Sequence, residues 1–258
     1  LPLPLPTPCR HGSFLYNPND EVGKSLELYG EWSEEEVSLF QPLLRSGETI
    51  VEVGANIGAH TVFFARAVGT LGKVVAIEPE RLLLQTLCAN LALNGFTNAY
   101  CYPFLLGETT DSAPVSRSNP PAETLFCPGN DPLERLQVIA LDRLELPQCR
   151  LLKIDAPGRE LSILKGAIKT IQSFQPILYI RNSLQAESFA LVQFLNRLGY
   201  NLYWHRSFLY NPNNFFQNSQ NAFGNAHAVN VLGFHSNCRI QVEGMEQIGV
   251  SGQSSSTP

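Results

Sequence analysis

Short apolar strands alternate with amphipathic helices along most of the chain, and this alternation limits the fold more than any other feature of the sequence. The first strand runs from Thr49 to Val53, ends at Gly54 and is followed by a helix to about Val68 that stops at Gly69. Strands buried on both faces and joined by helical crossovers pair in parallel. We therefore expect an α/β fold with a mostly parallel sheet, helices on both faces and a last strand that returns antiparallel.

The other elements follow from the same two periodicities, 3.6 residues for helices and two for strands. The expected further helices run from Ser33 to Leu44, from Glu80 to Asn94-Gly95 and from Ala186 to Leu198. One more helix carries Leu161, Leu164, Ile168 and Ile171 on one face. The expected further strands are Lys73 to Ile77, Ala99 to Phe104, Gln137 to Ala140, Leu151 to Ile154, Ile177 to Ile180, Tyr200 to Trp204 and Ala228 to Phe234. Ser33 and Glu36 have the pattern of a capping box.

Both ends of the chain and a long stretch in its middle lack this patterning. Residues 1–10 are rich in proline and predict a linker, and because the chain starts with Leu1 rather than Met we expect it to be part of a longer polypeptide. Residues 244–258 predict a flexible tail, because they offer little apolar surface. Residues 105 to 135 predict a lid or binding loop, or else a disordered insert. Residues 11–243 then form one domain.

The charge and the apolar content of the chain exclude two classes of partner. The chain has 18 Lys and Arg against 23 Asp and Glu, for a formal net charge of -5, and no run of four or more basic residues. It therefore lacks the positive charge that sequence-independent binding to nucleic acid needs. No apolar run approaches the roughly 18 residues that span a bilayer. We expect no nucleic-acid partner and no membrane partner.

The cysteines and histidines do not form a metal-binding pattern. The 6 cysteines lie far apart, with no C-x-x-C pair and no secretory segment before them. This is typical of reduced thiols in a cytoplasmic protein. The 5 histidines are equally scattered, and no H-E-x-x-H motif occurs. We expect a cytoplasmic protein without a metal site.

The turn after the first parallel strand is the candidate ligand site. In VEVGANIGAHT, residues 51–61, a buried strand runs into a glycine turn and a helix, which is where open α/β sheets bind ligands. A dinucleotide fingerprint would place glycine where Asn56 stands, so a nicotinamide oxidoreductase is disfavoured. A P-loop would need Gly-Lys-Ser/Thr, which is absent. Neither phosphate-binding motif fits.

Two carboxylates with a defined spacing suit a different ligand. Glu52 lies two residues before Gly54, where it can orient the loop or bind an ammonium group. Glu78 ends the second strand, where a carboxylate can accept both hydroxyls of a ribose. Each glutamate alone could be a strand-end carboxylate in solvent, but their joint spacing favours adenosine with a zwitterionic tail, as in S-adenosylmethionine. We assign to this cofactor Glu52, Gly54, Asn56, Gly58, Thr61 and Glu78.

Longer motifs carry a resemblance to a known family. They are VEVGANIGAHTVFFA (51–65), IEPERLLLQTLCANLALN (77–94), KIDAPGRELSILKGA (153–167) and LYNPNNFF (209–216), with LYNPND and LELYGEWSEEEV near the start. The resemblance covers nearly the whole chain from His11 to Phe234. They resemble the FkbM family of S-adenosylmethionine-dependent methyltransferases. The resemblance implies a Rossmann-like class I sheet of seven strands, and methyl transfer to a hydroxyl of a sugar or other small-molecule or glycan acceptor.

The chain departs from the family pattern at two positions. The family motif resembles K-I-D-V-E-G-x-E, and the expected Glu is Pro157 here, while the strand 176–180 runs into Arg181 instead of an acidic residue. Methyl transfer to an alcohol needs a base or an aligned, desolvated hydroxyl. Asp155 and Lys153 remain as candidate catalytic residues, with a structural ion pair as the alternative role of Lys153. The alternative function is a catalytically impaired cofactor-binding module with a binding or assembly role.

A ten-residue repeat lies near the two ends of the expected domain. HGSFLYNPND (11–20) and HRSFLYNPNN (205–214) agree at eight positions. Asn-Pro-Asn predicts a turn, and the Phe-Leu-Tyr before it can form a short strand. The repeat therefore indicates either two similar turns or two aromatic, amide-rich loops beside an acceptor pocket. His11 and His205 begin the two copies and are either further candidates for the base or surface residues.

Overall fold

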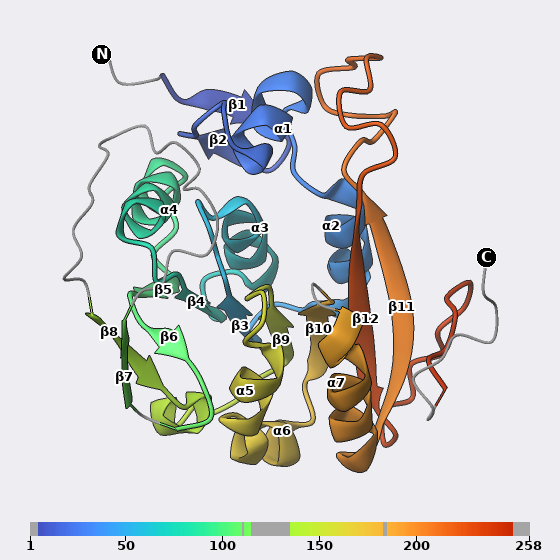
Figure 1. The fold of residues 1–258 in the computed structure, drawn as a ribbon. Helices are drawn as coiled ribbons and strands as arrows, with labels where there is room; N and C mark the ends of the chain where they lie inside the picture. Colours follow the sequence, from blue (N-terminus) through green and yellow to red (C-terminus); the bar gives the residue numbers. More distant parts are fainter. Residues whose placement is uncertain (1–4, 110, 115–134, 183–184, 250–258) are drawn as a thin grey trace.

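A seven-stranded sheet with the order β11-β12-β10-β9-β3-β4-β5 forms the centre of the molecule (Figure 1). The computed structural model describes residues 5–109, 111–114, 135–182 and 185–249. The strands are β3 (Thr49–Val53), β4 (Lys73–Ile77), β5 (Ala99–Tyr102), β9 (Leu151–Ile154), β10 (Ile177–Arg181), β11 (Tyr200–Phe208) and β12 (His227–His235). β12 runs antiparallel to β10 and β11, and the other neighbours are parallel. The predicted fold class is confirmed.

Helices cover both faces of this sheet (Figure 1), and their apolar side chains pack against it in two layers. One layer takes side chains from α1 (Glu21–Tyr29), α2 (Glu34–Phe40), α3 (Ala59–Val68) and α4 (Arg81–Leu93), and the other from α5 (Glu160–Lys165), α6 (Ile168–Phe174) and α7 (Gln185–Arg197). Successive strand residues alternate between the layers, so that Leu151 lies in the first and Leu152 in the second. Burial on both faces explains why most residues of these strands are apolar.

The predicted linker over residues 1–10 is partly wrong. β1 (Thr7–Cys9) pairs antiparallel with β2 (Gly12–Phe14), and Cys9 and Phe14 are buried in the first apolar layer. Pro8 is tolerated in β1 because a proline can occupy an edge strand whose N–H groups are not all needed for pairing. Burial of the two apolar side chains thus turns part of a proline-rich segment into a hairpin. Residues 1–4 lie outside the described part of the chain.

The predicted flexible tail, residues 244–258, also begins too early. Ile248 is buried and donates its N–H to the carbonyl of Leu202 at 2.8 Å, and Trp204 donates to the carbonyl of Glu246 at 2.9 Å. Leu202 and Trp204 belong to β11, which lies at the edge of the large sheet. An edge strand leaves backbone groups unpaired, and this segment pairs with them. The last nine residues of the tail lie outside the described part.

A small second sheet contains both ends of the stretch that was expected to be irregular. Its strands, in the order β6-β8-β7, are β6 (Leu105–Leu106), β7 (Asp111–Pro114) and β8 (Arg135–Ile139). The strand expected near Gln137 is therefore present, but it belongs to this sheet and not to the large one. The rest of the predicted lid, residue 110 and residues 115–134, lies outside the described residues. None of the helices that are described is long and apolar enough to cross a bilayer.

Two predicted helices differ in detail. The helix predicted from Ser33 to Leu44 forms α2 followed by a short 3₁₀ turn, η1 (Gln41–Leu43), because Pro42 cannot donate the N–H that a longer α-helix needs. The predicted Ser33 capping box does not form: the Ser33 hydroxyl hydrogen-bonds that of Ser207 at 3.0 Å. The helix predicted from the stripe of Leu161 to Ile171 is divided into α5 and α6 at Gly166. A Cβ at Gly166 would stand 1.9 Å from the carbonyl oxygen of Gly107. Another 3₁₀ turn is η2 (Leu141–Leu144).

Candidate active site

A cavity of about 340 Å³ opens where four neighbouring parallel strands end. Gly54 follows β3, Glu78 follows β4, Asp155 follows β9, and Arg181 is the last residue of β10, and all four line the cavity. β3 and β9 are the neighbours between which the strand order reverses. This reversal point at the carboxyl ends of the strands is where open α/β sheets bind ligands.

Most of the residues assigned to the site from the sequence line this cavity. Those that do so are Glu52, Gly54, Asn56, Glu78, Lys153 and Asp155, and the two departures Pro157 and Arg181 line it as well. Gly58 and Thr61 do not. Gly58, at φ 88°, begins α3, and the Thr61 hydroxyl donates to Glu52 at 2.7 Å. These two residues therefore shape the turn and the wall behind it.

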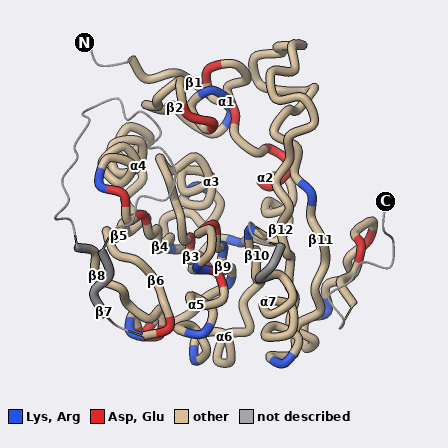
Figure 2. The backbone as a smooth tube through the Cα atoms, viewed as in Figure 1, with Lys and Arg blue, Asp and Glu red and all other residues tan. Residues whose placement is uncertain are grey.

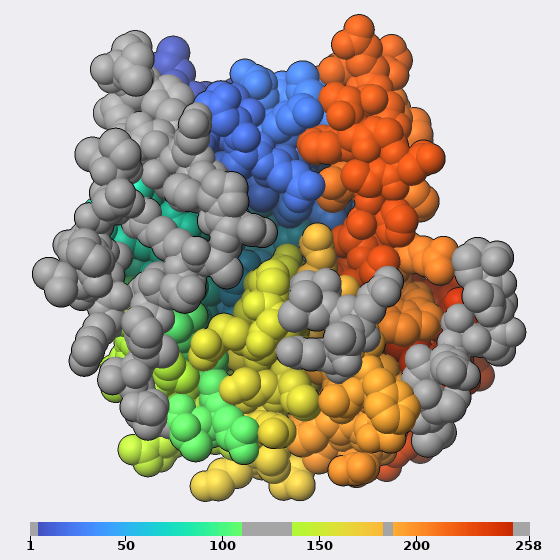
Figure 3. Space-filling model, viewed as in Figure 1, coloured from blue at the N-terminus to red at the C-terminus, as the bar shows by residue number. Residues whose placement is uncertain are grey.

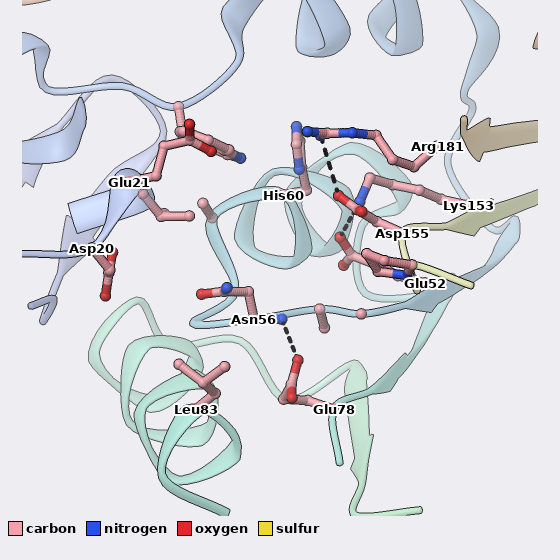
Figure 4. Close-up of a pocket in the computed structure, with 16 residues that line it drawn as sticks. Asp20, Glu21, Glu52, Asn56, His60, Glu78, Leu83, Lys153, Asp155 and Arg181 are labelled. Carbon is pink, nitrogen blue, oxygen red and sulfur yellow. Dashed lines mark hydrogen bonds and ion pairs between the residues drawn. The ribbon is translucent and has the colours of Figure 1, made fainter. Parts of the chain in front are cut away.

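The glycine turn is held by Glu78. Asn56 adopts φ 51° and donates its backbone N–H to Glu78 Oε2 at 2.8 Å, while the N–H of Glu80 reaches Oε1 at 2.9 Å. Gly54 lets β3 and β9 end close together, because a Cβ there would stand 1.9 Å from the carbonyl oxygen of Asp155. Figure 4 shows the bond between Asn56 and Glu78 beneath the turn.

Glu78 is a buried carboxylate that faces the cavity. Burial raises its pKa to about 7, against the opposing effect of the two backbone N–H groups that it accepts. Each of its oxygens accepts one of these bonds and retains a lone pair. Two hydroxyl groups on one ligand could be accepted by these remaining lone pairs. The chemistry of Glu78 therefore fits a ribose.

Lys153 and Glu52 form a buried pair, with 3.4 Å between Nζ and Oε1. Burial acts to lower the pKa of Lys153, but the carboxylates of Glu52, Asp155 and Glu36 raise it above its ordinary value. A lysine that stays protonated cannot accept a proton from a substrate. The structural ion pair, which the sequence left as an alternative, is thus the role that this geometry favours for Lys153.

Asp155 is a more accessible carboxylate of the cavity. Its side chain is 37% exposed, and its Oδ2 lies 3.6 Å from Nη1 of Arg181. Figure 4 shows Asp155, Arg181, Lys153 and His60 gathered at one end of the cavity, with Asp20 and Glu21 of the α1 region on the far side. In Figure 2, acidic and basic segments lie close together where β3, β9 and β10 end.

His60 lines the cavity and lies beside Glu36, and the sequence reasoning missed both residues. His60 Nε2 is buried, lies 3.5 Å from Glu36 Oε2, and has no hydrogen-bond partner among the described residues. Burial lowers the pKa of His60 well below its ordinary value and raises the pKa of Glu36. Glu36 also accepts from the Asn230 amide at 3.1 Å. His60 stands within the glycine-turn motif, which was the available signal, whereas nothing in the sequence places Glu36 beside it.

The two histidines proposed as further bases lie outside the cavity. His11 Nε2 is 2.7 Å from a carboxylate oxygen of Glu34, and His205 Nδ1 is 2.8 Å from the Tyr179 hydroxyl. Burial lowers the pKa of His205. Both rings are therefore engaged by neighbouring side chains away from the site.

The ten-residue repeat forms the same turn twice. Asn19 donates its N–H to Asn17 Oδ1 at 3.1 Å, and Asn213 donates its N–H to Asn211 Oδ1 at 2.9 Å. The first copy ends at Asp20, which caps α1 and lines the cavity. The reading as two similar turns agrees with this geometry, while a role in acceptor binding stays a prediction.

Glu31 joins the N-terminal segment to the loop between β11 and β12. Its carboxylate accepts from Arg10 Nε at 2.6 Å, from Asn211 Nδ2 at 2.7 Å and from the backbone N–H of Phe215 at 2.9 Å. Figure 3 shows the two segments, blue and orange, side by side at the top of the molecule. This contact fixes α1, and with it Asp20 and the neighbouring wall of the cavity.

A family model for the methyltransferase FkbM domain matches residues 52–202, from the glycine turn into β11. This match covers more than half of the chain. The chain belongs to the FkbM methyltransferase family. The family is one of S-adenosylmethionine-dependent methyltransferases, so its cofactor is S-adenosylmethionine. A search of the curated proteins finds no match.

Solved structures are similar to this chain at low sequence identity. Methyltransferase FkbM from Methylobacillus flagellatus is 18% identical with a TM-score of 0.49, and the match covers 76% of this chain and 50% of that one. This chain thus spans half the length of that relative. Precorrin 8w decarboxylase from Methanobacterium thermoautotrophicum is 16% identical with a TM-score of 0.50, over 85% and 99% of the two chains. Fibrillarin from Aeropyrum pernix, crystallised with S-adenosyl-L-methionine, is 10% identical with a TM-score of 0.44, over 77% and 74%.

Proposed function

We propose that this FkbM-family methyltransferase methylates a hydroxyl group of a sugar or other small-molecule or glycan acceptor. The observation that carries the proposal is the position of Asp155, a partly exposed carboxylate in the same cavity as the buried Glu78. An alcohol is a poor nucleophile while it holds its proton, and a carboxylate within reach can accept that proton. Asp155 is the residue to which we assign this role.

The cofactor would be held at the turn after β3. Glu78 would accept the ribose hydroxyls, and the backbone of the turn from Gly54 to Asn56 would approach the ligand closely. Glu52 lies behind this turn, fixed by Lys153 and Thr61, and maintains its shape. Bound S-adenosylmethionine supplies an electrophilic methyl group on a positively charged sulfur. The residues of the chain bind it, orient the acceptor and take the proton.

The cavity is suited to a small polar acceptor. Trp32, Asp20 and Glu21 line it. An aromatic ring beside carboxylates suits hydroxyl-rich ligands, which stack on the ring and donate to the oxygens. We propose such an acceptor, and not nucleic acid, as the partner in a cytoplasmic setting.

The proposal is tested in two steps. Calorimetric titration with S-adenosylhomocysteine measures whether the cavity binds the demethylated cofactor. Incubation with S-adenosylmethionine and a panel of sugars and polyols, followed by mass spectrometry, then detects methyl ethers. We expect binding, and transfer to at least one hydroxyl acceptor. Absence of cofactor binding, or transfer only to nitrogen or carbon, contradicts the proposal.

The Asp155–Arg181 ion pair keeps a second candidate open, a cofactor-binding module with impaired turnover. Arg181 places a positive charge near the carboxylate assigned as base, and a cofactor sulfonium in the same cavity would be repelled by it. Under this candidate the chain binds S-adenosylhomocysteine more tightly than S-adenosylmethionine and transfers slowly. The double change Pro157→Glu with Arg181→Glu should then raise transfer. Robust transfer by the unchanged chain, with no gain in the double variant, excludes it.

A further inference from the structure

Arg181 is a cation in the cavity whose hydrogen-bonding capacity is largely unused. Its side chain is 30% exposed, and its one ion pair in the described part of the chain is the 3.6 Å contact with Asp155. That distance is longer than a hydrogen bond, and no described residue accepts one from this guanidinium. A guanidinium carries five N–H donors in a planar fork that matches carboxylate and phosphate groups.

The other basic groups at this end of the cavity are already committed. Lys153 is buried and paired with Glu52. His60 is buried, and the lowering of its pKa by burial leaves the ring uncharged near neutral pH. Among the described residues that line the cavity, Arg181 is therefore the accessible positive charge.

The position of Arg181 relative to Asp155 limits what can bind. The two side chains extend from the ends of neighbouring parallel strands, β10 and β9, into the same end of the cavity (Figure 4). A ligand that occupies this end meets a hydrogen-bond donor fork and a carboxylate 3.6 Å apart. An anionic group would pair with the fork, and a hydroxyl group a few bonds away would donate to Asp155.

We propose that the acceptor is anionic, a hydroxyl compound such as a sugar acid or sugar phosphate whose carboxylate or phosphate binds to Arg181. This inference rests on the proposed methylation of a hydroxyl and specifies its substrate class. The anionic group takes Arg181 from Asp155 and leaves that carboxylate free to face the acceptor hydroxyl. A neutral acceptor would leave the Asp155–Arg181 pair in place.

The test measures ligand binding in the presence of saturating S-adenosylhomocysteine, so that the cofactor site is already filled and the sugars can bind only at the acceptor end of the cavity. D-Glucuronate, glucose 6-phosphate and neutral glucose are titrated by calorimetry into the unchanged chain. We expect one of the two anionic sugars to bind about tenfold or more tightly than glucose, because charge-assisted hydrogen bonds are stronger than neutral ones. The stronger of the two identifies carboxylate or phosphate as the group recognised. This preference should decrease as salt is raised.

Two variants connect the preference to Arg181. Arg181→Gln should abolish the preference for the anion and leave the affinity for S-adenosylhomocysteine within about twofold of the unchanged chain. Arg206→Gln removes an equivalent charge from the exposed face of β11, away from the cavity, and should retain the preference. Arg181→Lys keeps the charge without the fork and should show a weaker preference for the anion. This variant tests the inference if Arg181→Gln fails to fold.

Distinct results overturn the inference and the proposed function. Equal binding of all three sugars, or a preference that survives Arg181→Gln, overturns the anion site. A tenfold loss of S-adenosylhomocysteine affinity in Arg181→Gln also overturns it, because Arg181 would then hold the cofactor. An Arg181-dependent preference for anions in a chain that transfers no methyl group supports the anion site and contradicts the proposed reaction.

Discussion

Lys153 and Glu52 form an ion pair beneath the cavity, with 3.4 Å between Nζ and Oε1, and both side chains are almost completely buried. They stand opposite each other on the neighbouring strands β9 and β3. The pair thus connects the strand that ends at Gly54 to the strand that ends at Asp155. Removing one member of such a pair leaves an uncompensated charge in the interior.

Lys153→Met should therefore destabilise the fold by about 3–5 kcal/mol. The double change Lys153→Met with Glu52→Gln should recover much of this loss, since it removes both charges. Urea unfolding followed by circular dichroism measures the free energies, with Lys169→Met on the exposed face of α6 as the control. A loss below about 1 kcal/mol together with a large fall in turnover would instead make Lys153 a catalytic residue.

Glu78→Ala should weaken the binding of S-adenosylhomocysteine by about 1–3 kcal/mol, because a charged hydrogen-bond acceptor is removed from the proposed ribose site. The loss also frees the N–H of Asn56, which Glu78 holds at 2.8 Å. Calorimetry measures the affinity, and Glu108→Ala, which removes an exposed surface carboxylate, is the control. Unchanged affinity in Glu78→Ala contradicts the assignment.

Glu78 should also make the stability depend on pH. Its pKa is raised from 4.5 to about 7 in the folded chain, so the folded state binds this proton more tightly than the unfolded state. The contribution of this protonated carboxyl to the free energy of unfolding is complete below pH 4.5. It is lost as the pH rises to about 7, and the loss is of the order of 3 kcal/mol. Thermal or urea unfolding across this window should show a shallower decline in Glu78→Gln than in the unchanged chain. An identical pH profile in the two proteins would contradict the raised pKa of Glu78 in the folded chain.

Asp155→Asn should lower turnover about 10² to 10⁴-fold, the usual range for loss of a general base. Because Asp155 is assigned to the acceptor and Glu78 to the cofactor, the affinity for S-adenosylhomocysteine should change far less. Single-turnover experiments that detect the methylated product measure the change in rate. Calorimetry on the same variant measures the change in affinity for S-adenosylhomocysteine. Intact turnover with a true acceptor would make Asp155 a structural residue.

Local patterns in the sequence determine the frame of the site. The mostly apolar run of β3, the glycine turn that follows it and the position of Glu78 after β4 are each visible over a few residues. Parallel strands place their carboxyl ends at one edge of a sheet, so the order of strands and helices is enough to predict that Gly54, Glu78 and Asp155 lie close together. The joint spacing of Glu52 and Glu78 and the resemblance to the FkbM family indicate the cofactor.

Contacts between distant segments decide what the cavity contains, and the sequence does not reveal them. The capping-box pattern predicts that Glu36 caps its own helix, but Glu36 lies beside His60, and nothing in the sequence shows that Arg181 pairs with Asp155. The proline-rich start becomes a hairpin, and the tail pairs with β11, because burial of Cys9 and Ile248 stabilises segments with weak local preferences. Such pairings depend on which surfaces the folded chain brings together, and local propensity carries no information about them.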